Sequence, residues 1–260
     1  MLVAVASAKG SPGTTALAVL LASLWPGDVA LADVDPAGGD LALRYRGPDG
    51  APLEEDRGLL SLGAAVRRGA EAELAPHLQP VAGGLDVLVG VSAPEQVAGL
   101  GPVWGSVARA LRPHDRDVVA DCGRVLPGAA HLPVLAGADA VVLVARPDVA
   151  GAAHLRERVA ALAEPLRLGE PGGTPLGVVV RTSERDRRSA DDLAALLASG
   201  GTPVPVLGVV AEDARGVAAL EGQRPGAGRS TFVRSGRSLV PSVRDLAERR
   251  RAPEAVGRRA

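Results

Sequence analysis

The chain of 260 residues contains almost no lysine: Lys9 is the single one, and arginine supplies every other long-chain cation. Isoleucine and asparagine are absent, and methionine, phenylalanine, tyrosine and cysteine occur once each. This composition is typical of a high-GC genome, in which lysine codons are rare. A lysine that persists against that bias, in a glycine-rich segment between two apolar runs, indicates a function.

Other scarcities exclude whole classes of protein. One cysteine excludes an internal disulfide and fits a reducing cytoplasm. The sequence has no window of 18 uncharged apolar residues, so we expect no membrane span, and residues 1–8 are too short and lack the basic leader of a signal peptide. The histidines have no metal-ligand spacing, and we expect packing or surface roles for His77, His114, His131 and His154.

Hydrophobic residues make up 47% of the chain but aromatic residues only 2%, which predicts a core of Leu, Val and Ala. Apolar strand-like runs alternate with helical stretches. This order predicts an α/β fold with a mostly parallel, doubly wound sheet and helices on both faces. We expect helices over residues 14–24, 58–68, 95–111, 150–163 and 189–199, and surface loops over 46–56 and 169–174.

The segment around Lys9 has the context of a phosphate-binding turn. Residues 2–6 form a short apolar strand and residues 14–24 an apolar helix, so the glycine-rich turn between them joins a strand to a helix. Such a turn directs backbone N–H groups and the positive helix end at one point. An ordinary P-loop, G-x-x-x-x-G-K-[ST], would place its first Gly at Ala8 and its Lys at Thr14, whereas Gly13 and the hydroxyl of Thr15 fit it.

The same segment resembles the deviant Walker A motif, K-G-G-x-G-K-[ST]-[ST], of the MinD/ParA family of P-loop ATPases. Lys9 matches the signature lysine of that family, Ser11 replaces a glycine, and Thr14 replaces the ordinary P-loop lysine. The alternative is a Gly/Pro turn that binds no ligand. The resemblance implies that ATP is held by a turn made of Gly10, Ser11, Pro12, Gly13, Thr14 and Thr15.

Two further segments resemble the metal and water sites of that family. Residues 33–41 are similar to its switch I, D-x-D-P-Q-G-N, and residues 117–123 to its Walker B and switch II, D-x-x-I-I-D-x-P. The resemblance implies that Asp35 orients the attacking water and that Lys9 acts with it in catalysis. It also implies that Thr15, Asp35 and Asp121 hold Mg²⁺. Without the resemblance, Asp35 belongs to an Asp-Pro turn at a strand end.

Downstream strands follow the same order. Residues 140–148 resemble the strand that ends in T-x-P-E, and residues 205–213 resemble the P-x-L-G-x-I-P-x-D stretch beside the base pocket, which includes Ala211. Residues 177–181 resemble the strand that ends in an adenine-reading asparagine, but Arg181 occupies that place. Arg181 and Ala211 are therefore the expected nucleotide contacts on the base side, and the base preference stays open.

Charge is distributed unevenly along the chain. Residues 224–260 hold ten arginines against three acidic residues, a net +7, while the whole chain is −1 and residues 1–223 are therefore −8. We expect a nucleotide-binding domain over 1–223 and a basic C-terminal segment over 224–260, with a closing helix and a frayed tail. Leu239, Val243 and Leu246 are spaced for one helix face. That face either packs on the sheet or lies on a membrane as an amphipathic helix.

The resemblance implies a function as well as a fold. In the MinD/ParA family, two subunits enclose two ATP molecules, and the signature lysine of one reaches the phosphates held by the other. We therefore expect an ATP- and Mg²⁺-dependent homodimer that acts as a switch. Such a switch positions a protein partner in chromosome or plasmid partitioning, septum placement, or pilus or secretion assembly. The basic segment indicates nonspecific DNA or an anionic membrane surface as a further partner, with attachment at the nucleoid or inner membrane.

The sequence leaves the enzymatic status open. Because Thr14 lacks the ammonium of the ordinary P-loop lysine, we expect slow or doubtful ATP hydrolysis. Lys9 from the other subunit, or Arg124, is a candidate for compensating this loss. A degenerate pseudo-ATPase that localises a partner without turnover is the alternative. A small-molecule ATP-dependent enzyme of the dethiobiotin-synthetase sort is a third class, but the sequence offers no acid–base residues for a substrate pocket.

Overall fold

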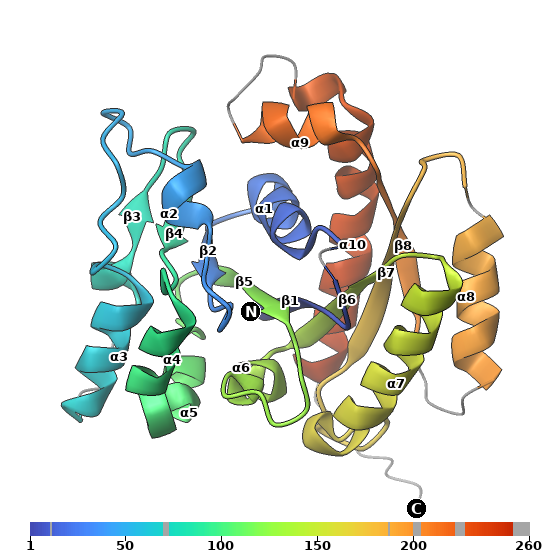
Figure 1. The fold of residues 1–260 in the computed structure, drawn as a ribbon, viewed down its shortest axis with the longest axis horizontal. Coiled ribbons are helices and arrows are strands. Elements are labelled where there is room, and N and C mark those ends of the chain that lie inside the picture. The colour runs from blue at the N-terminus through green and yellow to red at the C-terminus, as the bar shows by residue number, and fades with distance from the viewer. Residues whose placement is uncertain (11, 70–72, 187, 200–203, 222–226, 252–260) are drawn as a thin grey trace, which may run out of the picture.

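The computed structural model describes residues 1–10, 12–69, 73–186, 188–199, 204–221 and 227–251. Within them, eight strands form one sheet in the order β3-β4-β2-β5-β1-β6-β7-β8 (Figure 1). All neighbouring strands are parallel except β3 and β4. The strands are β1 Leu2–Ser7, β2 Val29–Asp33, β3 Gln79–Pro80, β4 Asp86–Leu88, β5 Asp117–Arg124, β6 Ala140–Ala145, β7 Leu176–Thr182 and β8 Val206–Ala211.

The central strands are continuous apolar runs because both of their faces are covered. Every residue of β1 and of β6 is buried, and β5 is buried over most of its length. Parallel sheets need such covering, since the helices that connect their strands must pack on the two faces. The predicted α/β fold with a mostly parallel sheet is therefore confirmed.

Helices cover both faces of the sheet and define two apolar cores (Figure 1). Residues of α1 Thr14–Leu24, α2 Leu41–Arg44, α9 Ala214–Leu220 and α10 Thr231–Arg251 pack into one core. The other core takes residues from α3 Leu59–Arg67, α4 Pro94–Leu100, α5 Trp104–Ala110, α6 Leu132–Gly137, α7 Val149–Leu166 and α8 Arg188–Ser199. The sheet is thus doubly wound, and the carboxyl ends of its parallel strands share one edge.

The single helix predicted over residues 95–111 is wrong, because the structure interrupts it. Residues 95–111 form two helices, α4 and α5, separated by the 3₁₀ turn Gly101–Val103. Pro102 has no N–H to donate, and Gly101 takes a positive φ of 48°, so the helix cannot run through. The short elements β3, β4, α2, α6 and α9 were not predicted. The loops expected over 46–56 and 169–174 lie at the surface between regular elements.

The last helix, α10, belongs to the core of the fold. Leu239, Val243 and Leu246 are buried, and α10 contacts β8 and α1. A Cβ on Gly236 would lie 2.7 Å from Leu20 of α1, which shows how closely the two helices approach. The apolar face of α10 is therefore used inside the protein and is not presented to a membrane surface in this arrangement. No helix of the described residues is long and apolar enough to cross a bilayer.

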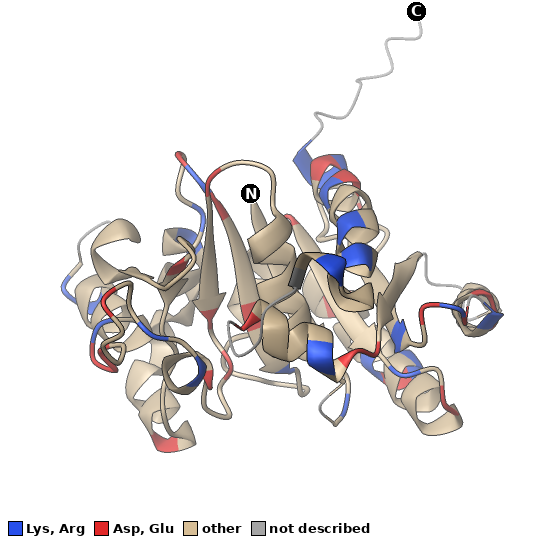
Figure 2. Ribbon diagram, turned by 90° about the horizontal axis from the view of Figure 1, so that it is seen from above, with Lys and Arg blue, Asp and Glu red and all other residues tan. Residues whose placement is uncertain are grey.

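The opposite face of α10 carries the cations of the basic segment. Figure 2 shows them as blue bands along the helix that leads to the grey C-terminal trace. Several are already engaged: Arg234 bonds to Glu184 at 2.7 Å, and Arg250 donates to Thr174 Oγ1 at 2.7 Å and to the carbonyl of Ala136 at 3.1 Å. Arg224, Arg258 and Arg259 lie outside the described residues. The division of the chain at residue 223 stays a prediction.

If α10 is a core helix, truncating its buried face will destabilise the protein. We expect Leu239→Ala to lower the free energy of unfolding by about 2–5 kcal/mol, because it removes buried methyl groups and leaves a cavity. Arg237→Ala, on the exposed face of the same helix, should cost less than about 0.5 kcal/mol. Urea unfolding followed by circular dichroism measures both. Equal small effects would mean that α10 leaves the sheet easily.

Candidate functional site

The strand-to-helix turn after β1 has the backbone conformation of an anion-binding turn. Gly10 and Gly13 take positive φ values of 71° and 90°, and Gly13 caps the N-terminus of α1. The first turn of α1 contains no acidic side chain, so nothing there offsets the positive end of the helix. Gly10 is exposed, Pro12 and Thr14 are buried, and Ser11 lies outside the described residues. The turn can therefore receive a phosphate through backbone N–H groups.

A cluster of carboxylates lies beside this turn, at the carboxyl ends of β2 and β5. Asp33 and Asp121 are register partners across the two strands, and both are about 1% exposed. The Gly123 N–H donates to the Asp121 carboxylate at 3.1 Å, and the Thr15 side chain of α1 lies close enough to lower the pKa of the same carboxyl. Asp35 follows two residues after β2. The structure thus brings Thr15, Asp35 and Asp121 together, as the sequence predicted for a metal site.

Burial perturbs the acids of this cluster. It raises the pKa of Asp121 to about 6, against the contacts with Thr15 and Gly123, which lower it. Burial, followed by the charge of Asp121, raises the pKa of Asp33 well above its ordinary value, and burial also raises the pKa of Asp35. Carboxylates held this way favour a cation, because neighbouring negative charges in a buried site repel one another.

Glycines make room for these acids. A Cβ on Gly123 would collide with the Asp35 carboxylate, and a Cβ on Gly39 would collide with that of Asp33. Gly123 also needs its positive φ of 56°. The sequence predicted that Gly123 lets the backbone approach a phosphate, but it assigned no role to Asp33 or Gly39. Both lie in the segment over residues 33–41 that resembles switch I, which was the available signal.

No group of three or more His, Cys, Asp or Glu side chains among the described residues is arranged to hold a metal ion by itself. This finding fits Mg²⁺, which proteins commonly hold through one or two carboxylates together with substrate phosphates. The residues that the sequence predicted for the metal are one hydroxyl and two carboxylates, and their role as metal ligands stays a prediction.

Lys9 lies at the same edge of the sheet but faces α7. Its Nζ lies 2.9 Å from Nε2 of His154, and an ammonium can only donate in such a contact. Both side chains border a cavity of about 180 Å³, together with Gly10, Pro12 and Arg146. The sequence analysis missed His154 as a neighbour of Lys9, since nothing local predicts contact across 145 residues.

The base side of the turn is occupied by Arg181, at the end of β7. Its Nη1 lies 2.7 Å from the point where a Cβ on Gly13 would stand. Glu212 forms ion pairs with Arg181 at 3.6 Å and with Arg146 at 3.2 Å. Ala211 is buried at the end of β8, and its N–H donates to Ser235 Oγ of α10 at 3.0 Å. The structure therefore brings Arg181 to the turn, whereas the N–H of Ala211 is already used within the fold.

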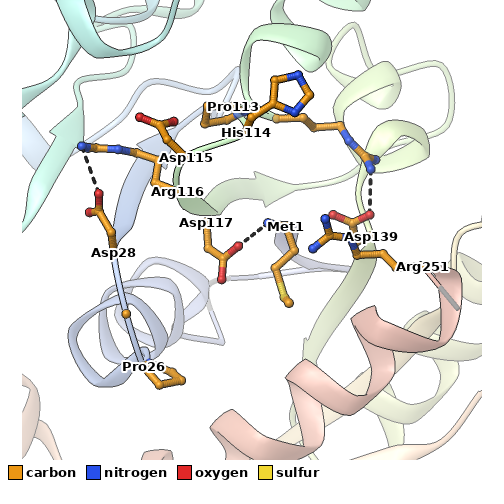
Figure 3. A pocket seen from close by; sticks show the side chains of 12 residues that line it. Met1, Pro26, Asp28, Pro113, His114, Asp115, Arg116, Asp117, Asp139 and Arg251 are labelled. Atoms are coloured by element: carbon orange, nitrogen blue, oxygen red, sulfur yellow. Dashed lines mark hydrogen bonds and ion pairs between the residues drawn. The ribbon is translucent and has the colours of Figure 1, made fainter.

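A separate cavity of about 410 Å³ lies at the opposite edge of the sheet, among residues at the amino ends of the strands (Figure 3). Its charged groups largely pair with one another: the Met1 amino group with Asp117, Arg116 with Asp28 at 3.3 Å, and Arg112 with Asp139 at 2.8 Å. Ligands of open α/β sheets bind at the carboxyl edge of the strands. We therefore place the candidate site at the P-loop turn.

The fold is similar to that of solved MinD and ParA ATPases. No protein-family model matches the chain, and no curated protein sequence matches it either. The likeness is structural. A ParA family ATPase from Chlorobium tepidum TLS aligns with a TM-score of 0.68 at 17% identity, covering 95% of this chain and 97% of that one.

Two nucleotide complexes align equally well. The septum site-determining protein MinD of Pyrococcus horikoshii OT3, complexed with Mg-ADP, gives a TM-score of 0.68 at 18% identity over 96% of this chain and 98% of that one. A Cyanothece McdA variant in complex with ATP gives 0.67 at 16% identity over 95% and 96%. At these identities the likeness shows the fold alone, so the function has to be argued from the site.

The acidic cluster generates a prediction about pH. A carboxyl whose pKa is higher in the folded than in the unfolded chain binds its proton more tightly when folded, so stability falls as the pH rises above about 4. We expect Asp33→Asn to be more stable than the wild type near neutral pH without metal, because the amide carries no charge beside Asp121. The advantage should shrink as the pH falls toward about 4.

Urea unfolding in EDTA across this pH range measures the difference. Asp49→Asn, which changes an exposed carboxylate in the loop over 46–56, is the matched control and should show little pH-dependent difference. A constant difference at all pH values would contradict the assigned cause.

Proposed function

We propose that the protein is a nucleotide-dependent dimeric switch of the MinD/ParA type, which binds ATP with Mg²⁺ and hydrolyses it slowly. One observation carries the proposal most directly. The side chain of Thr15 in the first turn of α1 lies beside the buried register pair Asp33 and Asp121, next to a turn whose glycine takes a left-handed conformation. This combination serves a metal-bound phosphate and has no evident use in a plain connecting turn.

The residues present fit a nucleotide with Mg²⁺, which is the ligand that the fold implies. Backbone N–H groups at Gly13–Thr15 would hold phosphate oxygens, and Thr15, Asp35 and Asp121 would hold Mg²⁺ directly or through water. The ion would neutralise phosphate charge. Asp35 stands against Gly123 and accepts the Ala37 N–H at 2.8 Å, so its carboxylate is fixed in direction. A carboxylate so fixed suits the orientation of a water molecule.

Dimer formation is part of the proposal. Lys9 is exposed at the nucleotide edge, where a second subunit would approach. The large hydrophobic side chains that are exposed among the described residues are Leu43, Leu126 and Val149, and they follow the carboxyl ends of β2, β5 and β6. Burial of these side chains against another copy of the chain would remove their apolar surface from water.

Hydrolysis of ATP is the step of the proposal that Thr14 affects. Thr14 is buried and neutral where an ammonium would stand in an ordinary P-loop, so stabilisation of charge on the phosphates is reduced. The second candidate is therefore a scaffold that localises a protein partner without hydrolysis. The position of Thr15 beside Asp121 favours nucleotide binding over a fully degenerate site. The partner, whether protein alone or also DNA or an anionic membrane near α10, stays a prediction.

We expect wild-type protein with Mg-ATP to double its molar mass from 26.2 kDa, and chelation of Mg²⁺ to abolish the change. Calorimetric binding and light scattering on the same sample measure both steps. Lys9→Ala should still bind ATP but remain monomeric, because its ammonium is needed across the dimer. Arg109→Ala is the control. It removes a cation of α5 that lines a different cavity from the one in Figure 3, together with residues 112–116, and it should dimerise normally.

Two results would contradict this proposal in different ways. Dimerisation of Lys9→Ala with ATP at the wild-type level would remove Lys9 from the dimer contact. A wild-type protein that binds no nucleotide at millimolar ATP would leave the scaffold as the function.

A gain-of-function variant tests the role of Thr14. We expect Thr14→Lys to raise the rate of ATP hydrolysis by about 10²-fold, since it restores a positioned cation against the phosphates. Phosphate release under saturating Mg-ATP measures the rate. Adding Thr15→Ala should remove the gain, because the metal contact is lost. An unchanged rate in Thr14→Lys would mean that another cation already compensates in the wild type.

A further inference from the structure

The side chain of Arg181 lies against the glycine-rich turn, in a position that the sequence alone does not predict. It starts at the end of β7, and its guanidinium lies over Gly13, the N-cap residue of α1. Nη1, Cζ and Cδ stand 2.7, 3.3 and 3.6 Å from the point where a Cβ on Gly13 would be. The absent side chain of Gly13 thus admits a guanidinium beside the first turn of the helix.

The positive charge of Arg181 is only partly neutralised by its ion pair with Glu212. Glu212 is shared between two guanidinium groups, with its Oε1 3.6 Å from Nε of Arg181 and 3.2 Å from Nη1 of Arg146. One carboxylate cannot neutralise two cations, and the first turn of α1 adds the positive end of a helix without an acidic residue. These side chains are 26–49% exposed, so a ligand can reach them.

We propose that Arg181 binds the phosphate chain of the nucleotide, and that the site consequently selects its ligand by phosphate rather than by base. This inference rests on the proposed nucleotide-binding function. Arg181 supplies from β7 the positive charge that Thr14 does not supply from α1. Glu212 is a positioning residue, since its ion pair at 3.6 Å holds the guanidinium.

The hydrogen-bonding capacity of arginine supports the loss of base selectivity. An asparagine amide carries both a donor and an acceptor and can pair with the donor and the acceptor on an adenine edge. A guanidinium carries donors alone, in a planar fork that matches phosphate oxygens. Arginine at this position therefore gains affinity for an anion and cannot read adenine through two complementary bonds.

Calorimetric titration with Mg-ATP, Mg-GTP, Mg-CTP and Mg-tripolyphosphate tests the inference. We expect the wild type to bind the three nucleotides with dissociation constants within about threefold of one another, and to bind tripolyphosphate measurably. Arg181→Gln should weaken all four ligands by about tenfold or more, because each loses a charge-assisted hydrogen bond. Arg234→Gln, which removes a guanidinium paired with Glu184 elsewhere, should change each constant less than about twofold. Thermal melting checks that each variant is folded.

The results that would contradict this inference differ from those that would contradict the proposed function. Tighter binding by Arg181→Gln would show that the guanidinium obstructs the site, and a wild-type preference for ATP above about 30-fold would show that the base is read. Either result, or unchanged binding in Arg181→Gln, overturns this inference while the proposed function stands. Absence of nucleotide binding in both proteins overturns the proposed function and this inference with it.

Discussion

The register between β2 and β5 is the constraint on which the candidate site depends. It places Asp33 directly beside Asp121, both buried, at the carboxyl edge of the sheet. Two buried carboxylates repel each other and lose hydration, which is a cost that a structural role alone does not justify. The surrounding features reduce that cost. Gly39 and Gly123 make space, the Gly123 N–H bonds to Asp121, and Thr15 lies close to the same carboxyl. A cation bound between acid and phosphate would offset the rest.

The departures from an ordinary P-loop include a loss of charge. The turn keeps the second glycine of that motif, the left-handed Gly13, and the hydroxyl of Thr15, whereas Ala8 replaces the first glycine and the ammonium expected at Thr14 is missing. Cationic groups instead reach the turn from its own start and from neighbouring strands: Lys9, Arg146 and Arg181. The charge of the two arginines at strand ends is partly shared with Glu212. This arrangement retains attraction for a polyphosphate but is less suited to stabilising charge that develops on one oxygen.

Sequence reasoning succeeded where a single local rule decides the structure. Apolar runs located six of the parallel strands, and the glycine-rich turn located the candidate site. It failed where tertiary contacts decide. The strands β3 and β4 are too short to show a periodic pattern. The apolar pattern predicts one helix over residues 95–111, but Gly101-Pro102 divides it into two. The positions of Arg181 over Gly13 and of His154 beside Lys9 depend on the packing of distant elements, so no spacing in the chain indicates them.

The contact between Lys9 and His154 raises the question of whether this lysine is free to serve a second subunit. The bond is 2.9 Å long but joins two solvent-accessible side chains. An exposed hydrogen bond of this kind contributes on the order of 1 kcal/mol, since water replaces it readily. A phosphate oxygen offers the ammonium a charge-assisted bond of roughly twice that strength in a site that excludes water. The balance would therefore favour transfer of Lys9 from His154 to a phosphate in the proposed dimer, once a partner subunit brings that phosphate within reach. The contact with His154 on α7 does not prevent this transfer.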